Sequence, residues 1–159
     1  MFADSTLGKH PIALSFSIQG FNLGGGLMGK YWLSENYCLR TALTGTFKDY
    51  NYGDIDWSRY TRIDINIGLT RQYCMRNNLS LYVGGLVGFG WQESWYGGSS
   101  QGISRIYMGS IVLGVEYWLS SGLSLSGEQE IIVRKTFGEQ TNDYDLSSSN
   151  SNIILSVYF

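Results

Sequence analysis

The sequence predicts an all-β protein, a single domain over residues 1–159 folded as an eight-stranded antiparallel up-and-down transmembrane β-barrel. Three observations lead to this prediction. The chain ends on an alternating strand, one hairpin pattern recurs three times, and charged residues make up only 15% of the chain. Because soluble domains carry about 25% charged residues, an ordinary charged surface is missing.

The C-terminal segment alternates apolar and polar residues and stops on an aromatic side chain. Ile153, Leu155 and Val157 share one face with Phe159, the last residue. Chain ends usually fray. An apolar strand with no polar tail therefore indicates that both of its edges are paired and that its apolar face is dry.

Three copies of one pattern mark tight turns. Each copy has an aromatic start, a few turn-forming residues and then an alternating apolar run, which is the signal of a short hairpin. The copies begin at Tyr31, Tyr73 and Tyr117, 42 and 44 residues apart. These turns are expected at one end of the barrel. The connections at the other end, one short and three long, are expected at Gly20–Gly24, Asp49–Ser58, Gln92–Gly102 and Gly138–Ser149.

Eight strands lie between these connections. They are expected at residues 11–20, 24–33, 37–48, 59–73, 79–91, 103–119, 123–136 and 150–159. Alternation sorts their side chains onto two faces. One face is apolar, as at Ile63, Ile65 and Ile67, and the other is small or polar, as at Ser80 and Tyr82.

The polar face is predicted to line a narrow lumen. Many of its residues are glycines or serines, which make a poor surface for water but leave room for long side chains opposite. Its charges are nearly balanced, and buried charges must be paired. The predicted lumen network of ion pairs comprises Lys30, Arg40, Lys48, Arg62, Asp64, Glu116, Glu128, Glu130 and Arg134.

The apolar face is predicted to meet lipid. No segment approaches the ~18 consecutive apolar residues of a membrane helix, so strands must form the span, and they must close so that every backbone group is paired. Aromatic residues gather at the tight-turn end, as interfacial aromatics do in such barrels. This aromatic girdle is expected to comprise Tyr31, Tyr37, Tyr73, Tyr117 and Phe159.

Over its whole length, and with its terminal Phe159, the chain resembles the eight-stranded outer-membrane barrels of the OmpX/OmpA transmembrane type. The resemblance implies the bacterial outer membrane, with short turns in the periplasm and long loops extracellular. It also implies contact with outer-membrane lipid and lipopolysaccharide, and another membrane protein is a further candidate partner. The net charge of −2 and scattered basic residues argue against nucleic acid. Residues 1–5 lack the pattern of a secretory signal, so a mature chain is expected.

The sequence predicts no catalytic residue, no metal site and no cofactor. The single histidine, His10, lies at the tight-turn rim, far from the outer leaflet where a lipid-modifying enzyme would act. Glu128 and Glu130 are suited to acid–base chemistry, but they lie among basic residues and are better interpreted as ion-pair partners. The acidic pairs 54/56 and 143/145 lack the spacing of a calcium loop.

The expected outer loops combine rigid aromatic residues with Gly, Ser and Asn. This combination is typical of recognition surfaces, and it is also typical of strands that extend above a membrane. The candidate recognition residues are Tyr50, Tyr52, Trp57, Trp95, Tyr96 and Tyr144.

The two cysteines are predicted to form a cross-strand disulfide. Cys38 and Cys74 are equidistant from residue 56, the expected centre of a hairpin, and both fall on the lumen face. Outside the cytoplasm a matched pair favours a bond. The alternative is two buried thiols displaced by a small shift of register.

Gln129 and Arg71 fall on the apolar face. Arg71 lies near a turn, where its side chain can reach the interface. For Gln129, nearer the middle of its strand, two explanations stay open. Either a bulge at Gly127 shifts the register, or Gln129 meets another protein.

The function that these observations favour is a small, non-enzymatic membrane barrel with a structural or surface-interaction role. An eight-stranded barrel has an interior just wide enough for side chains, and Trp32 and Trp118 are large lumen residues. The alternative is a narrow pore or a small-solute conduit. A membrane-embedded lipid-modifying enzyme is the least favoured interpretation.

Overall fold

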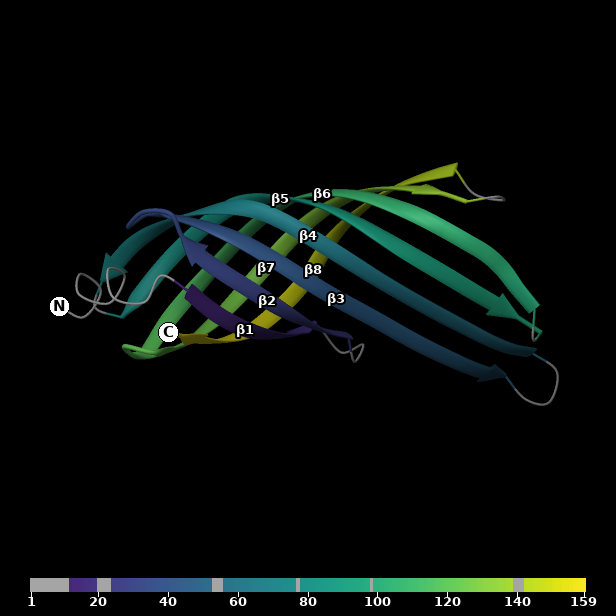
Figure 1. Cartoon of the computed structure of the whole chain (residues 1–159), viewed down its shortest axis with the longest axis horizontal. Helices are drawn as coiled ribbons and strands as arrows, with labels where there is room; N and C mark the ends of the chain where they lie inside the picture. The colour runs from purple at the N-terminus through teal and green to yellow at the C-terminus, as the bar shows by residue number, and fades with distance from the viewer. Residues whose placement is uncertain (1–11, 20–23, 53–55, 77, 98, 139–141) are drawn as a thin grey trace.

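The protein is a closed antiparallel barrel of eight strands (Figure 1). The computed structural model describes residues 12–19, 24–52, 56–76, 78–97, 99–138 and 142–159. The strands are β1 (Ile12–Gln19), β2 (Gly24–Trp32), β3 (Tyr37–Tyr52), β4 (Asp56–Arg76), β5 (Leu79–Tyr96), β6 (Ser99–Ser120), β7 (Leu123–Phe137) and β8 (Asn142–Tyr158). Each strand pairs with its neighbours in sequence and β8 pairs with β1, so the predicted fold class is confirmed.

The last strand closes the barrel. Phe16 of β1 pairs with Leu155 of β8, and the amide of Phe159 donates to the carbonyl of Ile12 over 2.9 Å. Both edges of this part of β8 are therefore paired, which explains how an apolar strand can end the chain without fraying.

The apolar face points outward, as the alternation predicts. Val87 on the outer face of β5 is 63% exposed, whereas Val112 on the inner face of β6 is fully buried. The interior is less polar than expected, because Ile106, Ile132 and Ile154 are also buried there. Within the described residues, no helix is long and apolar enough to cross a membrane.

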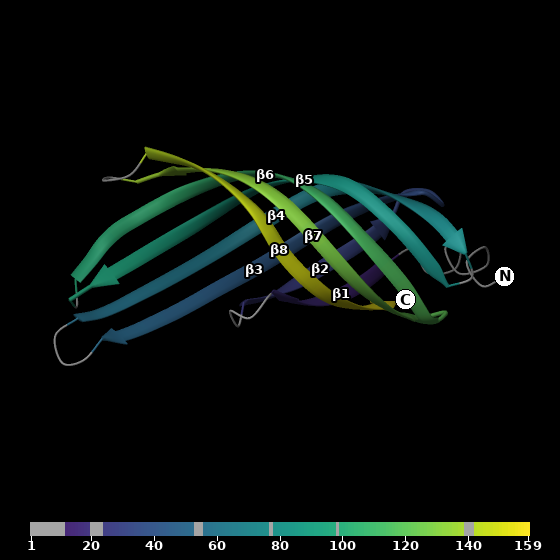
Figure 2. The same ribbon diagram turned by 180° about the vertical axis from the view of Figure 1, so that it is seen from behind.

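The strands differ greatly in length, and this corrects the predicted long loops. β1 and β2 have eight and nine residues, whereas β3 to β8 have between 15 and 22. The extra length projects at the end opposite the C-terminus (Figures 1 and 2). Most of 49–58, 92–102 and 138–149 is therefore strand, because neighbouring strands satisfy its backbone groups. Gly97, with a φ of 56°, turns β5 towards β6. Residues 20–23 lie outside the described residues.

The projecting part is an open sheet rather than a closed ring. β3 pairs with β2 only as far as Gly45, and β8 pairs with β1 only from Asn152 onward. The outer parts of β3 (46–52) and β8 (142–151) consequently have no second neighbouring strand among the described residues. We refer to this six-stranded sheet as the outer extension.

The register overturns the geometric basis of the predicted disulfide. Cys38 of β3 pairs with Thr70 of β4, so Cys74 lies four residues further along β4, about 13 Å away. A disulfide needs Cα atoms within about 7 Å. Cys38 is a buried free thiol. The prediction was wrong because the β3–β4 turn is centred near residue 54 rather than 56.

Glycines on the inner face make room for larger neighbours. A Cβ atom on Gly114 of β6 would overlap the ring of Tyr82 on β5, and one on Gly88 would overlap the carboxamide of Asn66. Large inward side chains of one strand thus lie over glycines of the next strand.

Candidate functional site: two ion pairs across the lumen

The ion pair nearer the tight turns joins β2 to β6. Lys30 Nζ lies 2.8 Å from Glu116 Oε1, and the two side chains are only 5% and 2% exposed. Tyr158 Oη donates to the same carboxylate oxygen over 2.6 Å, and Ser124 Oγ also donates to it. Glu116 is therefore a buried carboxylate whose Oε1 is engaged by one cation and two hydroxyl groups.

A second ion pair lies deeper in the barrel and joins β3 to β7. Arg40 Nη1 lies 2.7 Å from Glu128 Oε2, with both side chains almost completely buried. Tyr82 Oη donates to the same oxygen over 3.0 Å, and its ring lies 5.5 Å from the Arg40 guanidinium carbon. Asn152 Nδ2 approaches the other oxygen at 3.5 Å.

Both ion pairs cross the whole barrel. In a ring of eight strands, β2 and β6 are opposite each other, and so are β3 and β7. Side chains that meet from opposite walls must pass through the barrel axis. Lys30–Glu116 and Arg40–Glu128 therefore lie across the lumen.

The other predicted members of the lumen network are arranged differently. Arg62 pairs with Asp64 at 2.8 Å along β4, and Arg134 reaches Asp145 of β8 at 3.5 Å. Asp145 was not among the predicted partners because its segment was expected to be a loop. Among the described residues, neither Lys48 nor Glu130 forms an ion pair.

An aromatic cluster lies at the tight-turn end of the lumen. Trp32, Trp118 and Tyr158 pack with Ala13 and Cys38, all of them buried. The Trp118 and Tyr158 rings lie 4.4 Å apart. Sequence reasoning identified the two tryptophans as lumen residues but missed Tyr158, although the alternation of the last strand places it opposite Val157 and Phe159.

A small cavity lies between the aromatic cluster and the ion pairs. Its volume is about 10 Å³, and its lining includes Trp32, Arg40 and Gln72. Trp32 Nε1, Arg40 Nε and both polar atoms of Gln72 have no hydrogen-bond partner among the described residues. A polar cavity of this size has room for about one water molecule, and such a water would satisfy several of these groups.

The five residues of the predicted girdle all point outward at the tight-turn end. Tyr31, Tyr37, Tyr73, Tyr117 and Phe159 are exposed. The Arg71 guanidinium lies over two of these rings, 5.6 Å from Tyr37 and 5.0 Å from Tyr73. Arg71 is thereby held among aromatic side chains, as expected of a cation near an interface.

A second aromatic row, which sequence reasoning missed, lies on the outward face at the end of the apolar surface away from the tight turns. Phe89 contacts Trp91 and Tyr107, with ring centroids 4.5 and 5.2 Å apart, and Tyr107 contacts Phe137 at 5.7 Å. Lys135 Nζ lies 4.7 Å from the centroid of the Phe137 ring. These residues occupy alternate positions of β5, β6 and β7, and alternation in the full-length strands would have revealed the row.

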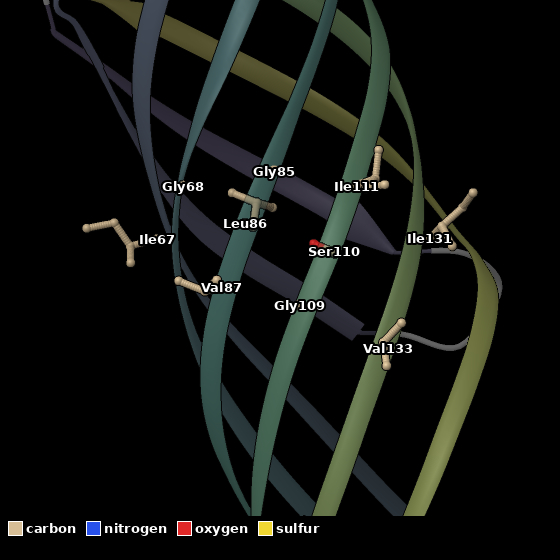
Figure 3. Close-up of a pocket in the computed structure, with 10 residues that line it drawn as sticks. All are labelled: Ile67, Gly68, Gly85, Leu86, Val87, Gly109, Ser110, Ile111, Ile131 and Val133. Atoms are coloured by element: carbon tan, nitrogen blue, oxygen red, sulfur yellow. The ribbon is translucent and has the colours of Figure 1, made fainter.

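A shallow apolar groove of about 500 Å³ runs over the outer wall between β4 and β7 (Figure 3). Gly85 and Gly109 form its floor, and Val87, Ile111 and Val133 rise around it. A Cβ atom on Gly109 would meet nothing within 4 Å, so this glycine leaves an open depression in the wall.

The expected recognition residues lie on strands rather than in loops. Tyr96 ends β5 and Tyr144 lies in β8, both strongly exposed, whereas Trp95 is half-buried. The backbones of Tyr50, Tyr52 and Trp57 belong to β3 and β4, and their side chains lie outside the described residues, as do His10 and Asp54.

The structure brings no metal-binding set together within its described part. There, no group of three or more His, Cys, Asp or Glu side chains is arranged to hold a metal ion. Glu128, which was considered for acid–base work, is occupied by Arg40 and Tyr82.

Neither a protein-family model nor a curated protein sequence matches the chain, but solved structures do. Neisserial surface protein A matches with a TM-score of 0.70 and 12% identity over 93% of each chain. The N-terminal β-barrel domain of Pseudomonas aeruginosa OprF has a TM-score of 0.57 and 14% identity over 93% of this chain and 95% of its own. Ail, the attachment invasion locus protein of Yersinia pestis, has a TM-score of 0.55 and 13% identity over 92% of each chain. The chain thus has the fold of the eight-stranded outer-membrane β-barrels, as its OmpX/OmpA-like sequence pattern predicts.

Proposed function

We propose that the protein is an integral barrel of the bacterial outer membrane with a closed lumen, and that it is not an enzyme but has a structural or surface-contact role. The observation that carries the proposal is that two buried ion pairs each join strands on opposite sides of the ring. A barrel closed in this way offers no water path, which disfavours the narrow pore and the small-solute conduit.

The spacing of the aromatic rows supports a membrane span. On β6, ten residues separate Tyr107 of the outer row from Tyr117 of the girdle. At about 3.3 Å per residue and a tilt of about 40°, this separation is about 25 Å along the barrel axis. The apolar belt of outer-membrane barrels has about this height.

Two cations on the outward face, the exposed Arg105 and the half-buried Lys135, support contact with phosphate-bearing lipid at the projecting end. Arg105 of β6 pairs in register with Phe137, and Lys135 of β7 pairs with Tyr107, so the two cations are diagonal neighbours on the outer face. Neither forms an ion pair with another described residue. In the proposed orientation the short turns are periplasmic and the extension is extracellular, so lipopolysaccharide phosphates would lie at this level.

The outer extension supports a role in surface contact. Its two open edges, 46–52 and 142–151, offer backbone groups to an added strand. Ail has been solved in complex with the heparin analogue sucrose octasulfate. On this chain a polyanion is less favoured, because Arg59 pairs with Asp49 and Arg134 pairs with Asp145.

Conductance in a planar bilayer tests the closed lumen. The wild-type protein is expected to show no steady channel current. A variant with Lys30, Arg40, Glu116 and Glu128 all replaced by Ala is expected to conduct, provided that its unboiled and boiled forms still migrate differently on a gel, as a folded barrel does. A steady current through the wild-type protein would refute the closed lumen.

A trimmed protein distinguishes the structural role from the surface role. Removing residues 48–60 and 93–103 cuts two hairpins at paired positions, Phe47 with Thr61 and Gln92 with Ser104, and leaves the barrel wall intact. If the trimmed protein restores detergent resistance to a deletion strain, the barrel body carries the function. If restoration requires the full chain, the outer extension carries it.

A further inference from the structure

Gln129 of β7 is a polar side chain on the outward face, where most of its neighbours are apolar. Its register partners are Leu113 of β6 and Ser151 of β8. A bulge between β7 and β8 does occur, but it follows Gln129, between Glu130 and Ile131. A bulge at Gly127 is therefore not the reason for the misfit of Gln129. The residue keeps its place in the alternation and is exposed.

The depth of Gln129 excludes water and headgroups as its partners in the proposed membrane. On β7, Leu125 pairs with Tyr117 of the girdle, and Lys135 pairs with Tyr107 of the outer row. Gln129 lies four residues from the first level and six from the second, about 10 Å and 15 Å along the barrel axis. A glutamine side chain is too short to reach either interface.

Only the oxygen of the Gln129 carboxamide has a hydrogen-bond partner among the described residues. Its Oε1 accepts a hydrogen bond of 2.9 Å from Ser151 Oγ. Its Nε2 donates to no acceptor among the described residues. An unsatisfied amide in hydrocarbon costs several kcal/mol, so a membrane protein gains stability when such a donor finds a partner. Acyl chains contain no acceptor at this depth.

We propose that Gln129 lies at the two-fold axis of a homodimer formed by the β7–β8 face, a proposal that rests on the membrane location proposed above. A carboxamide complements an identical carboxamide, because each has a free N–H and an oxygen with a spare lone pair. A two-fold axis along the membrane normal places the same residue of two copies at the same depth. Nε2 of each copy then donates to Oε1 of the other.

Gly127, the neighbour of Gln129 on the outward face of β7, permits two copies of the barrel to approach closely. Gly127 is exposed, and a Cβ atom there would meet nothing within 4 Å. A small residue beside a polar one is the combination that brings transmembrane segments into hydrogen-bonding contact. Ile153, which pairs with Gly127 on β8, provides an apolar contact on the other side.

Cysteine cross-linking tests directly whether Gln129 lies at the two-fold axis of a homodimer. In a background with Cys38→Ser and Cys74→Ser, Gln129→Cys should form an interchain disulfide when the protein in phospholipid vesicles is oxidised. Leu69→Cys is the matched control, because Leu69 lies on the outward face of β4, the strand opposite β8 in the ring. We expect at least several-fold more covalent dimer from position 129. Equal yields at the two positions, or a link from position 129 only to a different protein in native membranes, would overturn the homodimer.

Energy transfer between labelled copies in vesicles measures the association itself. Gln129→Leu should weaken association about ten-fold. Thr41→Val, which also removes a polar group from the outward face, should leave it unchanged. If dilution of the wild-type protein with lipid lowers energy transfer to the level expected for random encounters, the dimer is overturned. The barrel proposal would remain intact. A protein that stays soluble without detergent and ignores vesicles would refute the membrane location first.

Discussion

Arg40 and Glu128 meet at 2.7 Å from opposite strands of the barrel, β3 and β7, with almost no exposure of either side chain. Neither side chain could fill the lumen alone, since each reaches only part of the way across. Their contact at the axis satisfies two buried charges in the interior of the barrel. If the lumen is closed as proposed above, stability and impermeability would depend on the same pair.

Removing one charge of this pair should strongly destabilise the barrel. Glu128→Gln leaves the Arg40 guanidinium buried without its counter-ion, and we expect the free energy of unfolding to fall by about 3 to 5 kcal/mol. Urea unfolding in detergent micelles, followed by tryptophan fluorescence, measures the loss.

Replacing both Arg40 and Glu128 with Met should cost less than the sum of the single changes, since no charge is then left unpaired. Lys48→Gln, on the same face but without an ion pair, is the control. Additive effects at Arg40 and Glu128 would contradict their coupling.

Two glycines of β6 should respond in opposite ways to alanine. Gly114→Ala inserts a methyl group into the ring of Tyr82 and disturbs its hydrogen bond to Glu128, so it should destabilise the barrel by about 1 to 3 kcal/mol. Gly109→Ala, on the outer face, meets open space and should be neutral or slightly stabilising. Thermal unfolding of the two variants side by side measures the difference. Equal destabilisation would mean that the packing of Tyr82 over Gly114 is not as described.

The two faces of β4 should tolerate charge very differently. Ile65 points outward and is half exposed, so Ile65→Arg places a cation against hydrocarbon in the proposed membrane and should cost about 2 to 4 kcal/mol. Asn66→Asp, the next residue, faces the lumen and should be much milder. The yield of heat-modifiable folded protein after insertion into vesicles reports the difference. A reversed order would mean that the barrel exposes its polar face, as a soluble ligand-binding barrel does.

Cys38 should be a free thiol that is protected by folding. It lies in the buried aromatic cluster at the tight-turn end, and its register partner is Thr70 rather than Cys74. In folded protein it should resist an alkylating reagent. After denaturation without reductant, mass spectrometry should find both cysteines alkylated. A chain with neither cysteine alkylated would mean that Cys38 and Cys74 are bonded and that the β3–β4 register is shifted.

The number and order of the strands could be predicted from the sequence, but their outer ends could not. Strands 24–32 and 123–137 were placed within about a residue, because tight turns bound them at one end and alternation continues to the other. The outer ends of β3 to β6 were placed up to five residues short. There, segments rich in Gly, Ser and Asn have the composition of loops, and only the partner strand makes them extended.

The sequence by itself determined which side chains share a face, because the two-residue period of a strand is a local property of the backbone. It therefore identified Lys30, Arg40, Glu116 and Glu128 as inward charges. Which cation meets which carboxylate, and that Cys38 faces Thr70, depended on register and on which strands lie opposite each other once the ring closes. Those are relations between segments 30 to 90 residues apart, and a shift of register changes them without altering the alternation within any strand.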